Sequence, residues 1–124
     1  MNRKEYTAVL IEHFTGFVLD GVVAKDTAVL ANLTHCQCEV DLESTPPVIR
    51  FSLSNLFNAV WRHGRAVGLD LPRDSNWGKD FAQFCRSLMY PWPNESFERR
   101  GYRLYVLHRS SSHVKCRYEL SVTG

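Results

Sequence analysis

Residues 74–89 read DSNWGKDFAQFCRSLM, an amphipathic stretch with helix signals at both ends. Asp74 or Ser75 can serve as the N-cap, and Pro91 disfavours helix in the residue that precedes it. At about 100° per residue, one face gathers the apolar side chains Trp77, Phe81, Phe84, Cys85 and Leu88. The opposite face gathers Asn76, Lys79, Gln83 and Arg86, with Asp80 near its edge. The stretch therefore predicts a helix over 75–89 whose outward face is basic and amide-bearing.

A second amphipathic helix is expected directly before this one. Ser52 or Ser54 offers an N-cap, Gly68 offers a stop, and residues 69–72 form a turn. The residues between cap and stop place one apolar face at helical spacing: Leu53, Leu56, Phe57, Val60, Gly64 and Val67. Two helices joined by a turn are the pattern of a helix-turn-helix.

One short strand is expected before the helix pair and two strands after it. Residues 48–51 and 102–109 are rich in strand-forming residues. Over 114–121 apolar and polar residues alternate, as in a half-buried strand, with Val114, Cys116, Tyr118 and Leu120 on the apolar side. Ser110-Ser111-Ser112 is a small polar turn between the last two strands, which therefore form a terminal β-hairpin.

The N-terminal third predicts two further helices. Residues 3–19 carry amphipathic spacing and lead to a helix end near Asp20-Gly21. Asp26 or Thr27 can cap a second helix, whose apolar part is Ala28, Val29, Leu30 and Leu33. Residues 38–43 form a short strand or an extended linker, and Ser44-Thr45-Pro46-Pro47 excludes helix.

The order of these elements predicts an α+β fold: a winged helix-turn-helix with extra N-terminal helices and a C-terminal β-hairpin wing. In such a domain the second helix of the pair enters the major groove of DNA, and the hairpin tip meets the backbone beside it. The tip here is residues 109–115, which carry Arg109, His113 and Lys115 around three serines. Basic and hydroxyl groups are the ones that contact phosphate.

Length and composition indicate an ordinary globular chain. The 124 residues fit a single domain, with 44% hydrophobic and 23% charged residues. No apolar stretch reaches the roughly 20 residues of a membrane span, because Asp20 and Gly21 interrupt the longest one. The N-terminus runs into a helical pattern rather than a signal-peptide core. We therefore expect a cytoplasmic or nucleoid-associated protein without membrane contact.

Charge is distributed unevenly along the chain. Residues 1–45 hold three basic against seven acidic side chains, a net charge of −4, whereas residues 46–124 hold twelve against six, a net charge of +6. An acidic N-terminal helical part and a basic winged-helix part are therefore expected within the one domain. The basic part either faces a polyanion or faces the acidic part.

Residues 52–109 resemble the C-terminal winged-helix domain of phage and plasmid primase–helicases of the superfamily-3 type. The resemblance rests on Ser54-Asn55-Leu56-Phe57-Asn58-Ala59-Val60-Trp61 with Gly68, on residues 76–81, and on Arg99-Arg100-Gly101-Tyr102-Arg103-Leu104-Tyr105. It implies a small DNA-binding module of a replication protein. The chain has no phosphate-binding G-x-x-x-x-G-K-[ST] motif, so the resemblance implies the binding module without its ATPase.

The predicted nucleic-acid-binding residues lie on three elements. Asn76, Lys79, Gln83 and Arg86 occupy the outward helix face, where the amides can bond base edges. A second basic cluster lies around Gly101, and the wing tip adds a third. The additional residues are Arg99, Arg100, Arg103, Arg109, His113 and Lys115.

No constellation in the sequence indicates catalysis, a metal or another cofactor. The five histidines stand in no catalytic motif, and the aspartates beside the helix pair fit turn and cap positions. His35-Cys36-Gln37-Cys38 has zinc-binding residue types, but its spacing differs from the usual Cys-x2-Cys knuckle and no second pair follows. We expect reduced, buried thiols instead.

Two functions of different class remain open from the sequence. The leading hypothesis is a non-catalytic winged-helix protein that binds nucleic acid, with DNA as the expected form. The alternative is a protein-interaction or adaptor module, such as a small phage protein acting on a host complex, with a partner or self-association surface on residues 3–35. The chain's pI of 8.4 favours the protein-interaction module, because dedicated DNA-binding domains are usually more basic.

Overall fold

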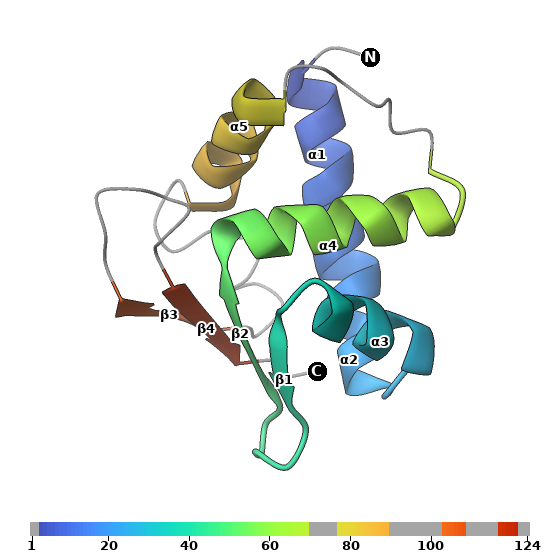
Figure 1. Ribbon diagram of the computed structural model, residues 1–124, viewed down its shortest axis with the longest axis vertical. Coiled ribbons are helices and arrows are strands. Elements are labelled where there is room, and N and C mark those ends of the chain that lie inside the picture. Colours follow the sequence, from blue (N-terminus) through green and yellow to red (C-terminus); the bar gives the residue numbers. More distant parts are fainter. Residues whose placement is uncertain (1–2, 70–76, 90–102, 109–116, 122–124) are drawn as a thin grey trace.

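A computed structural model describes residues 3–69, 77–89, 103–108 and 117–121, with side chains at 4–69, 79–88, 103 and 117–121 (Figure 1). The N-terminal elements are α1 (Arg3–His13), the π-helix η1 (Phe14–Val18), α2 (Leu19–Val23) and α3 (Thr27–His35). They are followed by β1 (Glu39–Asp41), β2 (Val48–Ser52), α4 (Leu53–Ala66), α5 (Trp77–Met89), β3 (Arg103–His108) and β4 (Arg117–Ser121). The predicted α+β class is confirmed.

The strands form one small antiparallel sheet in the order β1-β2-β4-β3. The predicted pairing of the last two strands is confirmed, with Leu104 opposite Leu120, while the expected turn at 110–112 lies outside the described residues. β2 pairs with the other edge of β4, placing Phe51 opposite Tyr118 and Ile49 opposite Leu120. These four side chains alternate onto one face of the sheet and join the helices in a common hydrophobic core.

Helix α5 packs against α1 and α4 through the predicted apolar face. Phe81, Phe84, Cys85 and Leu88 are buried, and Phe57 of α4 meets the Phe81 and Phe84 rings edge-on at centroid distances of 5.8 and 5.2 Å. The side chain of Trp77 lies outside the described residues. Edge-on rings are a favourable aromatic geometry, so these contacts fix the rotation of α5 about its axis.

The burial of Asp80 departs from the predicted helix face. Its side chain was expected at the edge of the outward face, yet only 5% of the residue is exposed. Asp80 directly precedes buried Phe81, and α5 is flanked by both α1 and α4, so the covered sector is wider than one apolar stripe. Asp80 also takes part in an interaction with another group. The outward face of α5 is therefore narrower and carries less negative charge than expected.

Helix α4 begins and nearly ends where the sequence predicted. The Ser52 hydroxyl accepts a hydrogen bond from the Asn55 backbone N–H at 3.4 Å, and Gly68 adopts φ +92° after the last turn. Its apolar face is buried from Leu53 to Gly64, but the prediction for Val67 is wrong, because 47% of that residue is exposed. Val67 is already the C-cap and leaves the helical face.

The first helical segment continues beyond the predicted end at Asp20-Gly21 and stops at Val23. The helix continues through Gly21. A glycine fits at this position because α3 approaches the helix closely there. A Cβ atom there would lie 2.6 Å from Val29 Cγ2. The predicted cap of α3 is confirmed, since Asp26 Oδ1 accepts from the backbone N–H groups of Ala28 and Val29 at 2.9 and 3.2 Å.

The helical run Lys4–Val23 is long and apolar enough to cross a membrane by length and composition. The expectation that no stretch reaches this length is therefore wrong, because the helix passes through Asp20 and Gly21 without interruption. Half of the run is buried inside the molecule, in contact with the other core helices. A helix in the core of a globular protein can be equally long and apolar.

Candidate nucleic-acid interface

The exposed face of α5 carries two cations at a two-turn spacing. Lys79, Ala82 and Arg86 are exposed, in line with the predicted outward face. Seven residues of α-helix separate Lys79 from Arg86, about 10 Å along the axis. Within the described part of the chain, neither cation forms an ion pair with a carboxylate. Among the described residues, no carboxylate therefore neutralises either charge.

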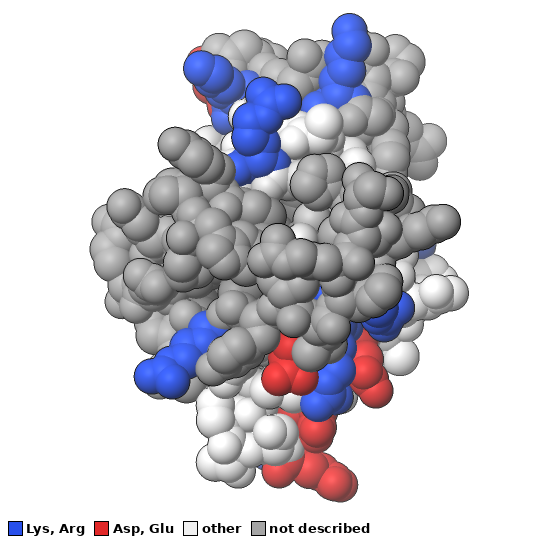
Figure 2. Space-filling view, turned by 90° about the vertical axis from the view of Figure 1, so that its left-hand side faces the viewer, with Lys and Arg blue, Asp and Glu red and all other residues white. Residues whose placement is uncertain are grey.

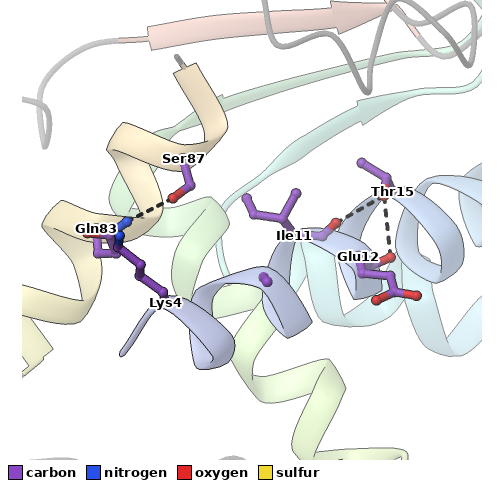
Figure 3. Close-up of a pocket in the computed structure, with 7 residues that line it drawn as sticks. Lys4, Ile11, Glu12, Thr15, Gln83 and Ser87 are labelled. Atoms are coloured by element: carbon purple, nitrogen blue, oxygen red, sulfur yellow. Dashed lines mark hydrogen bonds between the residues drawn. The ribbon is translucent and has the colours of Figure 1, made fainter. Parts of the chain in front are cut away.

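Gln83 lies at the border of this face rather than at its centre. Its side chain is half-buried, and its Nε2 donates a hydrogen bond to Ser87 Oγ at 3.1 Å. Both residues line an open groove between α5 and α1, where Lys4 points toward Gln83 (Figure 3). Lys4 was not among the predicted site residues, because its position in the acidic N-terminal part gave no sign of its proximity to α5.

The sheet contributes two further exposed cations. Arg103, a predicted site residue, begins β3 opposite Ser121, and Arg117 begins β4 opposite Ser52. Arg117 was predicted only as part of a polar strand face. By contrast, Arg50 of β2 is engaged in ion pairs with Glu119 at 2.8 Å and Glu39 at 3.7 Å. Its hydrogen bond to the Glu119 carboxylate raises the pKa of Arg50.

The remaining predicted site residues lie outside the described residues: Asn76, Arg99, Arg100, Arg109, His113 and Lys115. Lys79, Gln83, Arg86 and Arg103 are the predicted residues that the structure describes, three of them on α5. Among the described side chains, α5 with the start of α1 is therefore where the predicted interface can be assessed.

The surface charge differs between the two ends of the molecule (Figure 2). In this view blue side chains predominate at the upper end, where α5 and the start of α1 lie in Figure 1. Red and blue side chains mix at the lower end, around the turn between β1 and β2. The mixed end agrees with the Arg50 ion pairs, whereas the upper end presents cations without partners among the described residues.

The predicted buried thiols are confirmed for Cys36, Cys38 and Cys85. Burial raises the pKa of the Cys38 thiol to about 12, with a further contribution from Cys36. Burial also raises the pKa of Cys36, whose Sγ accepts a hydrogen bond from Asn58 Nδ2 at 3.7 Å. Thiols with raised pKa values are poor nucleophiles and poor metal ligands at neutral pH. Among the described residues, no three metal-ligating side chains form a group that could hold an ion.

No protein family, no curated protein and no solved structure matches this chain significantly. Its function is therefore argued from its own residues and topology.

Proposed function

We propose that this protein binds nucleic acid, with DNA as the expected form, through a winged-helix arrangement and without catalysis of its own. Lys79 and Arg86 carry the proposal, because both are exposed on one face of α5 and neither has a carboxylate partner among the described residues. Cations on a helix face are suited to the phosphates that line the major groove.

The topology supports the winged-helix reading. The chain order is β2-α4-α5-β3-β4, with β4 between β2 and β3 in the sheet, and this order is consistent with a helix pair followed by a wing. The first helix of the pair would cross the backbone, and α5 would be the recognition helix. Arg103 and Arg117 begin the two strands of the β3–β4 hairpin, at its opposite ends, and would add phosphate contacts there.

The resemblance to superfamily-3 primase–helicases of phages and plasmids suggests a replication role for such a module. It rests on residues 52–109, which span α4, α5 and β3. A cytoplasmic or nucleoid-associated location is part of the same proposal. The chemistry asked of the protein is binding alone, so we expect it to act next to a catalytic partner.

A protein-interaction module is the second candidate function, and exposed apolar side chains in residues 3–35 favour it. Phe17 of η1 is 46% exposed and Val23 of α2 is 42% exposed. The Phe17 ring stacks on His13, at 5.2 Å between centroids, and is held in place while still reaching solvent. A surface of this kind would bind a partner or a second copy of the protein. The outward face of α5 would then be an ordinary solvent-exposed surface.

Fluorescence anisotropy with labelled duplex and single-stranded oligonucleotides separates the two functions. Four to seven phosphate contacts predict that affinity falls at least about 100-fold between roughly 50 and 200 mM salt. No binding at the lower salt concentration, or binding that salt leaves unchanged, would contradict the proposal. Association that depends on protein concentration and ignores DNA would favour the interaction module.

A further inference from the structure

A groove lies between α1 and α5, lined by side chains of both helices (Figure 3). It is open to solvent and has a volume of about 500 Å³. Pockets for small ligands usually combine an apolar floor with a few polar groups, in volumes of roughly 300–1,000 Å³. The volume of this groove lies within that range, and its lining combines the apolar side chains of Ala8 and Ile11 with five polar or charged ones.

One end of the groove gathers hydrogen-bond donors. The Lys4 ammonium of α1 points toward the Gln83 amide of α5, which in turn donates one of its two N–H groups to Ser87 Oγ (Figure 3). The second N–H of Gln83 and the three of Lys4 have no acceptor among the described residues. Donors carrying positive charge, brought together from two helices, favour an anion such as phosphate.

The middle and the far end of the groove have different chemistry. Ala8 and Ile11 supply apolar surface at the centre. Glu12 and Thr15 line the other end, and the Thr15 hydroxyl already donates to the backbone carbonyls of Ile11 and Glu12. The Glu12 carboxylate has no cationic partner among the described residues, so it remains available as an acceptor.

The two charged ends are separated by a nucleotide-sized distance. Eight helical residues place the Lys4 and Glu12 backbones about 12 Å apart along the axis of α1. A nucleotide carries its phosphate at one end, then its sugar and a flat base. In cytosine, adenine or guanine the base bears an amino group on its edge. Carboxylates accept hydrogen bonds from such amino groups, most typically from cytosine N4.

We propose that this groove binds a nucleotide unit, with its phosphate at Lys4 and Gln83, its base over Ala8 and Ile11, and the amino group of the base at Glu12. If the nucleotide belongs to a nucleic acid strand, this inference rests on the proposed function. It then adds to that function by naming an unstacked nucleotide as the ligand of the groove. A free mononucleotide has the same chemistry and is the other source.

Ala8→Trp is the most direct test, because Ala8 is exposed and a bulky ring there fills the groove without entering the core. Ala31→Trp, at an exposed position of α3, is the matched control. Anisotropy with a labelled oligo(dC) and calorimetry with cytidine monophosphate measure the two sources separately. We expect Ala8→Trp and Lys4→Ala each to weaken binding of oligo(dC) at least about tenfold, with Ala31→Trp unchanged.

Base preference provides a second readout. Oligo(dT) lacks the exocyclic amino group, so it should bind more weakly than oligo(dC), and Glu12→Gln should reduce that difference. Oligonucleotide binding that neither Ala8→Trp nor Lys4→Ala changes would overturn the groove site while leaving the proposed function intact. Binding of the mononucleotide alone would support the groove and contradict the proposed function. Binding of neither probe by the wild-type protein would overturn both.

Discussion

His13 Nε2 and His63 Nδ1 lie 2.9 Å apart in the core between α1 and α4. Only one of these nitrogens can carry the proton of that hydrogen bond, so the contact requires at least one neutral ring. Burial lowers the pKa of both histidines, and the neighbouring His63 ring lowers the pKa of His13 further. Asp26 acts in the opposite direction on His63 but is the smaller influence.

The His13–His63 pair predicts that stability falls on acidification. In the folded protein the pKa values of both histidines are below the ordinary value of 6.5, so at acidic pH the unfolded chain binds more protons. The free energy of unfolding should therefore be unaffected by this pair above pH 6.5 and should decrease as the pH falls below 6.5. Urea unfolding at several pH values measures this loss. His63→Gln should flatten the dependence, because it removes one of the two rings that bind a proton more weakly in the folded protein. A wild-type stability that rises between pH 6.5 and 5 would refute the account.

Thr7→Val is predicted to stabilise the protein. Thr7 is 1% exposed, and its hydroxyl has no hydrogen-bond partner among the described residues, so the native chain carries the desolvation cost of that group. Replacing it with an isosteric apolar side chain should raise the free energy of unfolding by roughly 1 kcal/mol. Thr15→Val is the matched control, because the Thr15 hydroxyl is bonded to two carbonyls and its removal should give no gain. Equal effects of the two substitutions would contradict the prediction.

Gly21→Ala is predicted to destabilise the packing of α2 against α3. The added Cβ would lie 2.6 Å from Val29 Cγ2, and Val29 is itself only 1% exposed, so either the Val29 side chain or one of the two helices must shift. Overpacking of this kind costs about 1–3 kcal/mol. In a Val29→Ala background, Gly21→Ala should lower the free energy of unfolding clearly less. Thermal or urea unfolding of the wild type, the two single variants and the double variant measures this difference. Additive effects would exclude the contact as the cause.

The sequence predicted the local structure well wherever the signal is carried by neighbouring residues. The caps Asp26 and Ser52, the glycine stop at Gly68 and the apolar face of α5 are all confirmed. The two caps depend on a side chain and a backbone group within one helical turn, the stop depends on the conformational freedom of one glycine, and the apolar face depends on residue spacing along a single helix. For that reason no knowledge of the tertiary fold was needed to find them.

The errors arose where the tertiary fold decides. The sequence predicts a helix stop at Gly21, because nothing in it shows that α3 packs against this glycine. Asp80 was placed on an exposed edge because its burial follows from the position of α5 between two other helices. The groove residue Lys4 lies almost eighty positions from Gln83, and only the packing of α1 on α5 brings the two together. Contacts at such separations leave no periodic pattern in a single sequence.

The affinity of a double charge reversal for a labelled DNA duplex at low salt tests the central claim most directly. The comparison includes the wild type and the variants Lys79→Glu, Lys79→Glu/Arg86→Glu and Lys25→Glu. Lys25→Glu is the control for charge, because it changes the net charge as Lys79→Glu does but lies at an exposed site after α2. We predict a loss of roughly 100-fold or more for the double variant and little change for Lys25→Glu. A folded double variant that binds DNA as tightly as the wild type would contradict the assignment of α5 as the nucleic-acid-binding helix.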